Sequence, residues 1–169
     1  KYNLAPAPNA DGTYPVPDAS NPFSYPEFPF ANPPYSARAY AYASVAQFDA
    51  LVAGWHFKSL YNRPAPYNVD ATIEPYHVAK TSLPSYPLED AVVAGAAFTM
   101  LRALFPADTA FINEKVNEAA WYKQWAGAAV ASDVTAGLNL GKSVAAKALN
   151  RAKSDGMKNA IGSKSIQDS

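Results

Sequence analysis

The sequence predicts an all-α fold, a helical bundle with an extended N-terminal arm, and three observations support this. Apolar residues recur at helical spacing along the body of the chain, and no segment alternates apolar and polar residues as a half-buried strand does. Prolines gather in the first 34 residues and in one later loop. Alanine is abundant and charge is low, which favours closely packed helices over a charged, solvent-facing coiled coil.

The composition narrows the range of functions. A chain of 169 residues suits one domain with a real core. Its 14 basic and 14 acidic residues balance, so nothing attracts a nucleic acid. Without cysteine there is no disulfide, thiolate nucleophile or zinc–thiolate site, and two histidines, His56 and His77, argue against a histidine-built metal site. The longest apolar run, 91–101, is too short for a membrane span of about 20 residues, so we expect no transmembrane segment.

Residues 1–34 form a segment of their own, which we predict to be an extended arm. Nine of the 15 prolines lie there, and proline disfavours both helix and central strand. The segment also carries aromatic residues, in which disordered linkers are poor. We expect its rings to lie on the helical body or on a partner, or the segment to be an ordered surface coil. The rings are Tyr2, Tyr14, Phe23, Tyr25, Phe28 and Phe30.

The first predicted helix spans 35–61, where Val45, Phe48, Val52 and Trp55 recur at helical spacing. Arg63-Pro64 ends it, because the residue before proline avoids the α region. A proline-rich loop follows over 64–87.

Three further helices are predicted. The second spans 88–105 and has Glu89 and Asp90 in its first turn. There we expect their negative charges to interact favourably with the helix dipole and their side chains to cap the helix. The third spans about 107–124, capped by Asp108. The fourth begins after Gly127, is capped by Ser132 or Asp133, and ends near 154–156. Residues 35–156 thus form the helical domain, and 157–169 a polar tail that we expect to fray.

Single residues leave the chemistry open. Lys58 and Arg63 could grip an oxyanion, although cations also simply suit a helix C-terminus. Gly137 and Gly141 lie four apart on one helix face, a spacing that permits close helix packing.

The order of these segments resembles the superfamily of vanadium-dependent haloperoxidases and type 2 phosphatidic acid phosphatases, in particular its secreted bacterial branch. The resemblance runs from about Asn32 to Gly156 and implies a haloperoxidase-like helical bundle. With the Met-less start, it also implies a periplasmic or extracellular location. It is clearest in NPPYSARAYAYASVAQFDA, YNRP, YPLEDAVVAGAA and SDVTAGLNLGKSVA.

The family binds phosphate or vanadate through three motifs, and this chain departs from each. In the first, Lys–six residues–Arg-Pro, Lys58 and Arg63 match in kind, but only four residues separate them and His56 stands at the family's spacing. In the second, Pro-Ser-Gly-His, the aligned residues are Pro87-Leu88-Glu89-Asp90. In the third, Ser-Arg–five residues–His, they are Tyr122-Lys123 and Ala129, so the family's nucleophile and vanadium ligand is an alanine.

Three hypotheses follow. In the first, which we favour, the chain is a non-catalytic structural or interaction protein, without cofactor, in which Glu89 and Asp90 form ion pairs with Lys58, Arg63 and Lys123. In the second it is a phosphatase- or haloperoxidase-like enzyme with altered chemistry. Those three cations would then hold an oxyanion, phosphate or vanadate, while Asp90 acts as acid–base or, with Glu89, binds a metal. In the third it is part of a larger bundle, completed by a second chain or the rest of a longer protein.

Overall fold

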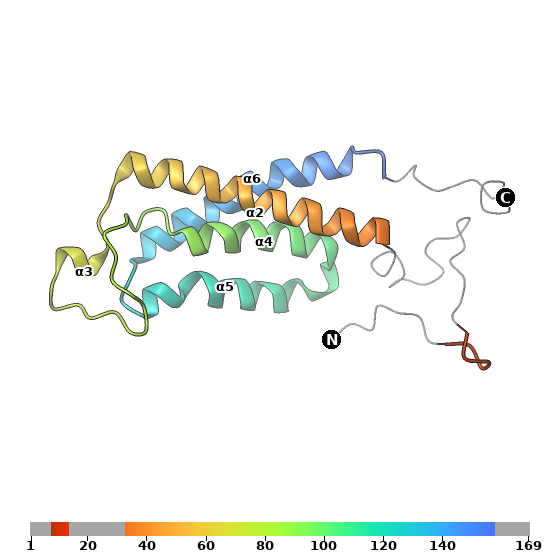
Figure 1. Cartoon of the computed structure of the whole chain (residues 1–169), viewed down its shortest axis with the longest axis horizontal. Helices are drawn as coiled ribbons and strands as arrows, with labels where there is room; N and C mark the ends of the chain where they lie inside the picture. The colour runs from red at the N-terminus through yellow and green to blue at the C-terminus, as the bar shows by residue number, and fades with distance from the viewer. Residues whose placement is uncertain (1–7, 14–32, 158–169) are drawn as a thin grey trace. The chain divides into compact units, whose positions relative to one another are not determined.

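The computed structural model describes residues 8–13 and 33–157 and confirms the all-α class: no strand occurs in these two ranges. The first helix, α2, spans Pro33–Tyr61, and a short helix, α3, spans Pro66–Val69. Helix α4 spans Glu89–Leu104, and a 3₁₀ turn, η1, spans Pro106–Asp108. Helices α5, Thr109–Trp125, and α6, Ala131–Lys153, complete the bundle (Figure 1). Most of the predicted arm lies outside the described residues, and so does the polar tail beyond Met157.

The chain divides into two compact units, and the helical body is the unit from Tyr42 to Ala152. The described part of the other unit contains a hydrogen-bonded turn at Asn9–Thr13 and an ion pair between Arg38 and Asp155, with a distance of 2.7 Å between Nε and Oδ2.

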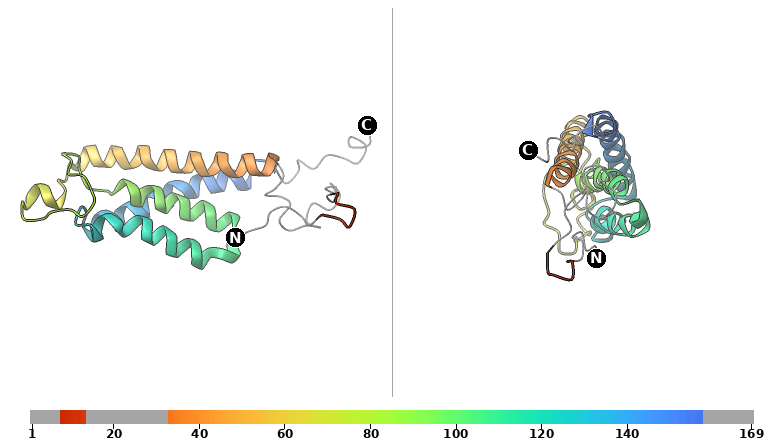
Figure 2. Two further views of the ribbon diagram at one scale, coloured as in Figure 1. Left: turned by 60° about the horizontal axis from the view of Figure 1, so that its bottom comes forward. Right: turned by 90° about the vertical axis from the view of Figure 1, so that its right-hand side faces the viewer.

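Helices α4 and α6 form the centre of the helical body, because both contribute to its two large core clusters (Figure 2). One cluster joins α4 to α5 and α6 through Ala94, Val116 and Val134, among others. The second joins α4 to α2 and α6 through Ala50, Ala96 and Ala145. Alanines make up four of the six buried residues of the second cluster, so α2, α4 and α6 lie close together there, as the alanine content predicts.

Glycine brings α6 onto α4, which confirms the packing predicted for Gly137 and Gly141. A Cβ at Gly137 would lie 2.5 Å from the carbonyl oxygen of Leu88, and one at Gly141 would lie 2.8 Å from the backbone nitrogen of Ala96. Gly95 of α4 sits equally close to the backbone of Leu138. Since no side chain fits at these positions, the sequence has glycine there.

The helix ends follow local rules, with two corrections to the predicted caps. Asn62, in a left-handed conformation at φ 45°, ends α2 directly before Arg63-Pro64. Helix α4 has Leu88 as its N-cap residue, so Glu89 and Asp90 do not cap it. Helix α6 begins at Ala131, one residue before the predicted caps. Asp133 instead reaches back from the first turn and accepts a 2.9 Å hydrogen bond from the backbone N–H of Val130.

The apolar residues noted on α2 face away from the bundle. Val45, Phe48, Val52 and Trp55 are 51, 66, 55 and 38% exposed. The buried face of α2 carries Ala46, Ala50, Gly54 and Lys58 instead. Close packing against α4 explains the difference: Gly54 lies against Val92, and larger residues would hold the two helices apart.

Candidate functional site

Lys58 lies at the C-terminal end of α2 and is nearly fully buried, with 2% of its side chain exposed. A buried ammonium needs an opposite charge and hydrogen-bond acceptors. Glu89, at the start of α4, supplies the charge at 2.6 Å, and the carbonyl oxygen of Pro84 accepts a second hydrogen bond. The last turn of α2 is thereby tied both to α4 and to the loop before it.

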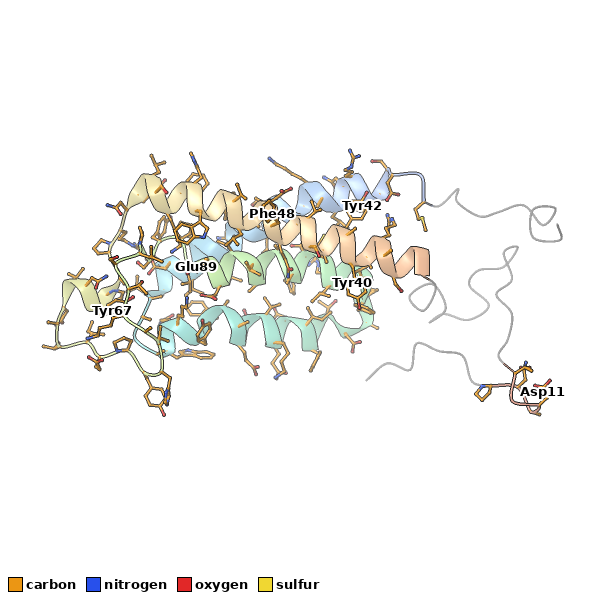
Figure 3. All side chains as sticks on the ribbon, in the orientation of Figure 1. Asp11, Tyr40, Tyr42, Phe48, Tyr67 and Glu89 are labelled. Atoms are coloured by element: carbon orange, nitrogen blue, oxygen red, sulfur yellow. The ribbon has the colours of Figure 1, made fainter. Side chains whose placement is uncertain are left out.

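Lys123, near the end of α5, also reaches Glu89 and pairs with Asp90 beside it. Its Nζ lies 2.5 Å from Asp90 and 3.5 Å from Glu89. Glu89 thus bridges lysines from two helices, and it lies between α2 and α5 in Figure 3. We call Lys58, Glu89, Asp90 and Lys123 the ion-pair cluster.

The ionisation of the cluster reflects this pairing. Burial by itself raises the pKa of Glu89, but the hydrogen bond and charge of Lys58, with the charge of Lys123, hold the pKa below its ordinary value. Burial by itself lowers the pKa of Lys123, and the hydrogen bond and charge of Asp90 raise it above its ordinary value. Burial also raises the pKa of Tyr122, as does the charge of Asp90. Glu89 and Lys123 are therefore both charged at neutral pH.

Arg63 belongs to a separate group. Its guanidinium pairs with Asp133, whose side chain is fully buried, and donates a 3.0 Å hydrogen bond to the hydroxyl of Ser132. The guanidinium also lies 4.4 Å from the ring centre of Tyr86, a cation–π contact. The predicted pairing with Glu89 and Asp90 is therefore confirmed for Lys58 and Lys123 and wrong for Arg63.

Asp133 is the partner that sequence reasoning missed. Ser132-Asp133 directly precedes an apolar helical pattern, which indicates a cap. Only the fold shows that the start of α6 lies beside the end of α2, where an arginine needs a carboxylate. The sequence did carry one signal: two carboxylates were assigned to three cations, which left one cation without a carboxylate of its own.

Ala129 and His56, which stand at two of the positions aligned with the resembling family's motifs, bring no reactive side chain to the cluster. Ala129 is 4% exposed and packs in the same core cluster as Leu88. His56 is exposed on α2, where its ring lies edge-on to Phe57 at 5.3 Å.

Two hollows adjoin the cluster. A cavity of about 100 Å³ is lined by Lys58, Ser85, Glu89 and Lys123, with residues of the loop between α2 and α4. A more open groove of about 640 Å³ runs between α4 and α5, and Glu89 and Asp90 lie along it. Apart from these carboxylates and Lys115, its lining is largely apolar.

Within ranges 8–13 and 33–157, no three histidine, aspartate or glutamate side chains gather in a way that could hold a metal ion. No helix described there combines the length and apolarity needed to cross a membrane. Comparisons of the chain with protein families, curated proteins and solved structures gave no match.

Proposed function

We propose that this chain is a helical protein of the haloperoxidase and phosphatase type that has lost catalysis and serves as a structural or interaction component. One observation carries the proposal: each of the three cations that would hold an oxyanion is paired with a carboxylate. Lys58 and Lys123 face Glu89 and Asp90, so the ion-pair cluster has no net charge when all four groups are ionised. An incoming phosphate would have to displace carboxylates that are already well placed.

The absence of a nucleophile at position 129 supports the same function. Covalent catalysis requires a nucleophile activated by a neighbouring group. The methyl group of Ala129 offers none, and its burial leaves no room for a larger residue without repacking. The chain keeps the charges of an anion site but uses them to join α2, α4 and α5.

The test is calorimetric titration of the full chain with vanadate and with phosphate, alongside assays of phosphatase and haloperoxidase turnover. We expect neither binding nor turnover in the wild type. Glu89→Gln should gain affinity for both anions, because it leaves two lysines with one carboxylate. Arg63→Ala is the control, and it should leave the absence of binding unchanged, because Arg63 lies outside the ion-pair cluster.

The runner-up, an enzyme with an altered site, is favoured by the cavity of about 100 Å³ beside Lys58 and Lys123. It predicts wild-type anion binding, and turnover that falls in Asp90→Asn, since Asp90 would be the acid–base or metal-binding group. Micromolar binding of vanadate with turnover that depends on Asp90 would overturn the non-catalytic function.

A further inference from the structure

The outer face of α2 is exposed but apolar, as a buried surface usually is. A surface helix normally places charged residues opposite its core-facing side. Between residues 42 and 61, the charged side chains are Asp49 and Lys58, and Lys58 is buried in the ion-pair cluster. Outward there are large apolar side chains, among them Phe48, which is labelled in Figure 3. We call Val45, Phe48, Val52 and Trp55 the α2 stripe.

The spacing of the α2 stripe selects a helix as its partner. Its four residues follow one another at intervals of three, four and three, which is the a and d pattern of two helices that pack lengthwise. A flat sheet or an extended peptide does not require this spacing. A second helix laid along the stripe would cover all four residues at once.

The α2 stripe is also complementary to itself in the antiparallel direction. In an antiparallel helix pair, a positions face d positions of the partner. When two copies cross at the level of Ala50, between Phe48 and Val52 on the outer face, Val45 faces Trp55 of the second copy and Phe48 faces Val52. Each aromatic ring then meets a small β-branched residue. A parallel pair would instead set Phe48 against Phe48 and valine against valine. The aromatic pairs would then be too large for the space between the helices, and the valine pairs would leave gaps.

We propose that the α2 stripe is the contact surface for a second copy of this chain, docked antiparallel about a two-fold axis near Ala50. This is an isologous interface, in which each copy offers the same patch. With full side-chain areas on the order of 150 to 250 Å², the exposed fractions give roughly 400 Å² of apolar surface per chain. A standard interface buries about 800 Å² per partner, so this patch is about half of one and forms a weak, reversible dimer.

This proposal names the partner for the interaction role proposed above, and it stands on different residues. Asp49 flanks the α2 stripe at the rim, where solvent screens its charge. The ion-pair cluster is buried and borders the stripe at Trp55, whose ring centre lies 5.5 Å from Nζ of Lys58, so the tests below change Phe48 and Val52 instead. A failure of either proposal therefore leaves the other intact: anion binding would remove the non-catalytic function without affecting the dimer.

The first experiment is sedimentation equilibrium of the full chain over concentrations that bracket the micromolar range. The wild type should pass from monomer to dimer. Phe48→Glu should remain monomeric with an unchanged circular dichroism spectrum, because Phe48 is exposed and contributes little to the fold. Leu60→Glu is the matched control, since Leu60 is 65% exposed on the same helix but outside the stripe, and it should dimerise like the wild type. A wild type that stays monomeric at every concentration, or a Phe48→Glu dimer, would overturn the proposal.

The second experiment tests the direction of docking, and the absence of cysteine makes it simple. Phe48→Cys and Val52→Cys proteins are oxidised separately and as a mixture. Antiparallel docking predicts that the 48–52 cross-link in the mixture forms several-fold faster than either 48–48 or 52–52. Faster formation of the two symmetric cross-links would show parallel docking and reject the two-fold axis at Ala50.

Discussion

Glu89 links the two lysines of the ion-pair cluster, because its carboxylate contacts Lys58 from α2 and Lys123 from α5. Removing it leaves Lys58, which is almost wholly buried, with the carbonyl oxygen of Pro84 as a hydrogen-bond partner but without a countercharge. An ion pair of this kind contributes less than its Coulomb energy, since both charges leave water. Breaking it from one side nevertheless costs the full desolvation of the ion that remains.

We predict that Glu89→Gln lowers the free energy of unfolding by on the order of 2 kcal/mol at neutral pH. Because the folded pKa of Glu89 lies below its ordinary value of 4.5, its stabilising effect is full above that pH and disappears as pH falls through the folded pKa. The gap between wild type and variant should therefore narrow in acid. Urea unfolding at a series of pH values measures it. Glu114→Gln, in an exposed pair with Lys115, should change little at any pH, and an equal loss in both variants would contradict the prediction.

The sequence could identify the cluster's members but not all their pairings. Lys58, Glu89, Asp90 and Lys123 are visible as charges that flank apolar helices, and opposite charges in a low-charge chain are expected to meet. Which cation meets which carboxylate depends on how the helix ends converge. That is why the pairing of Arg63 was wrong: Asp133 is 70 residues away along the chain and lies beside it only in the folded bundle.

Helix α2 shows why the pattern predicts a helix more readily than its orientation. Spacing by three and four residues marks the helix correctly, but α2 has apolar residues on both faces, so periodicity alone cannot choose the buried one. Here the buried face is the one with small residues, Ala46, Ala50 and Gly54, because α4 packs too closely against α2 to leave room for Phe48 or Trp55. Local signals, such as Pro64 and Gly127, placed the helix ends within a few residues.

The contact between α4 and α6 depends on Gly141 more than on any apolar side chain. We predict that Gly141→Ala destabilises the protein by about 1 to 3 kcal/mol, because the added methyl overlaps the backbone at Val92 and Ala96 and forces the helices apart. This loss of about 1 to 3 kcal/mol is the net change: the cost of the overlap outweighs the roughly 1 kcal/mol by which alanine is more favourable than glycine in a helix. Thermal unfolding measures the net change. Asn139→Ala, on the exposed side of α6, is the control and should be neutral or slightly stabilising. A stabilised Gly141→Ala protein would show that α6 moves freely.

Across the helical body, two kinds of contact hold the helices together: close packing of small residues and ion pairs. The glycines and alanines fix the distances between α2, α4 and α6 along their length. The ion-pair cluster acts at one end, where the last turn of α2, the first of α4 and the last of α5 meet. The opposite end of the α4–α5 pair is closed by η1.

This one-sided arrangement should appear in the rate at which backbone amides exchange their hydrogens with deuterium. Exchange in a folded protein requires local opening, and a helix opens first where fewer contacts must break. In α5, amides in the last turn around Lys123 should exchange more slowly than those near the η1 end around Asn113. Asp90→Asn should flatten this gradient by releasing Lys123, whereas Glu118→Gln, on the exposed face, should leave it unchanged. Helix α5 would then open first at its η1 end, while the ion pairs keep its other end attached to α4, so that local unfolding of the bundle has a direction.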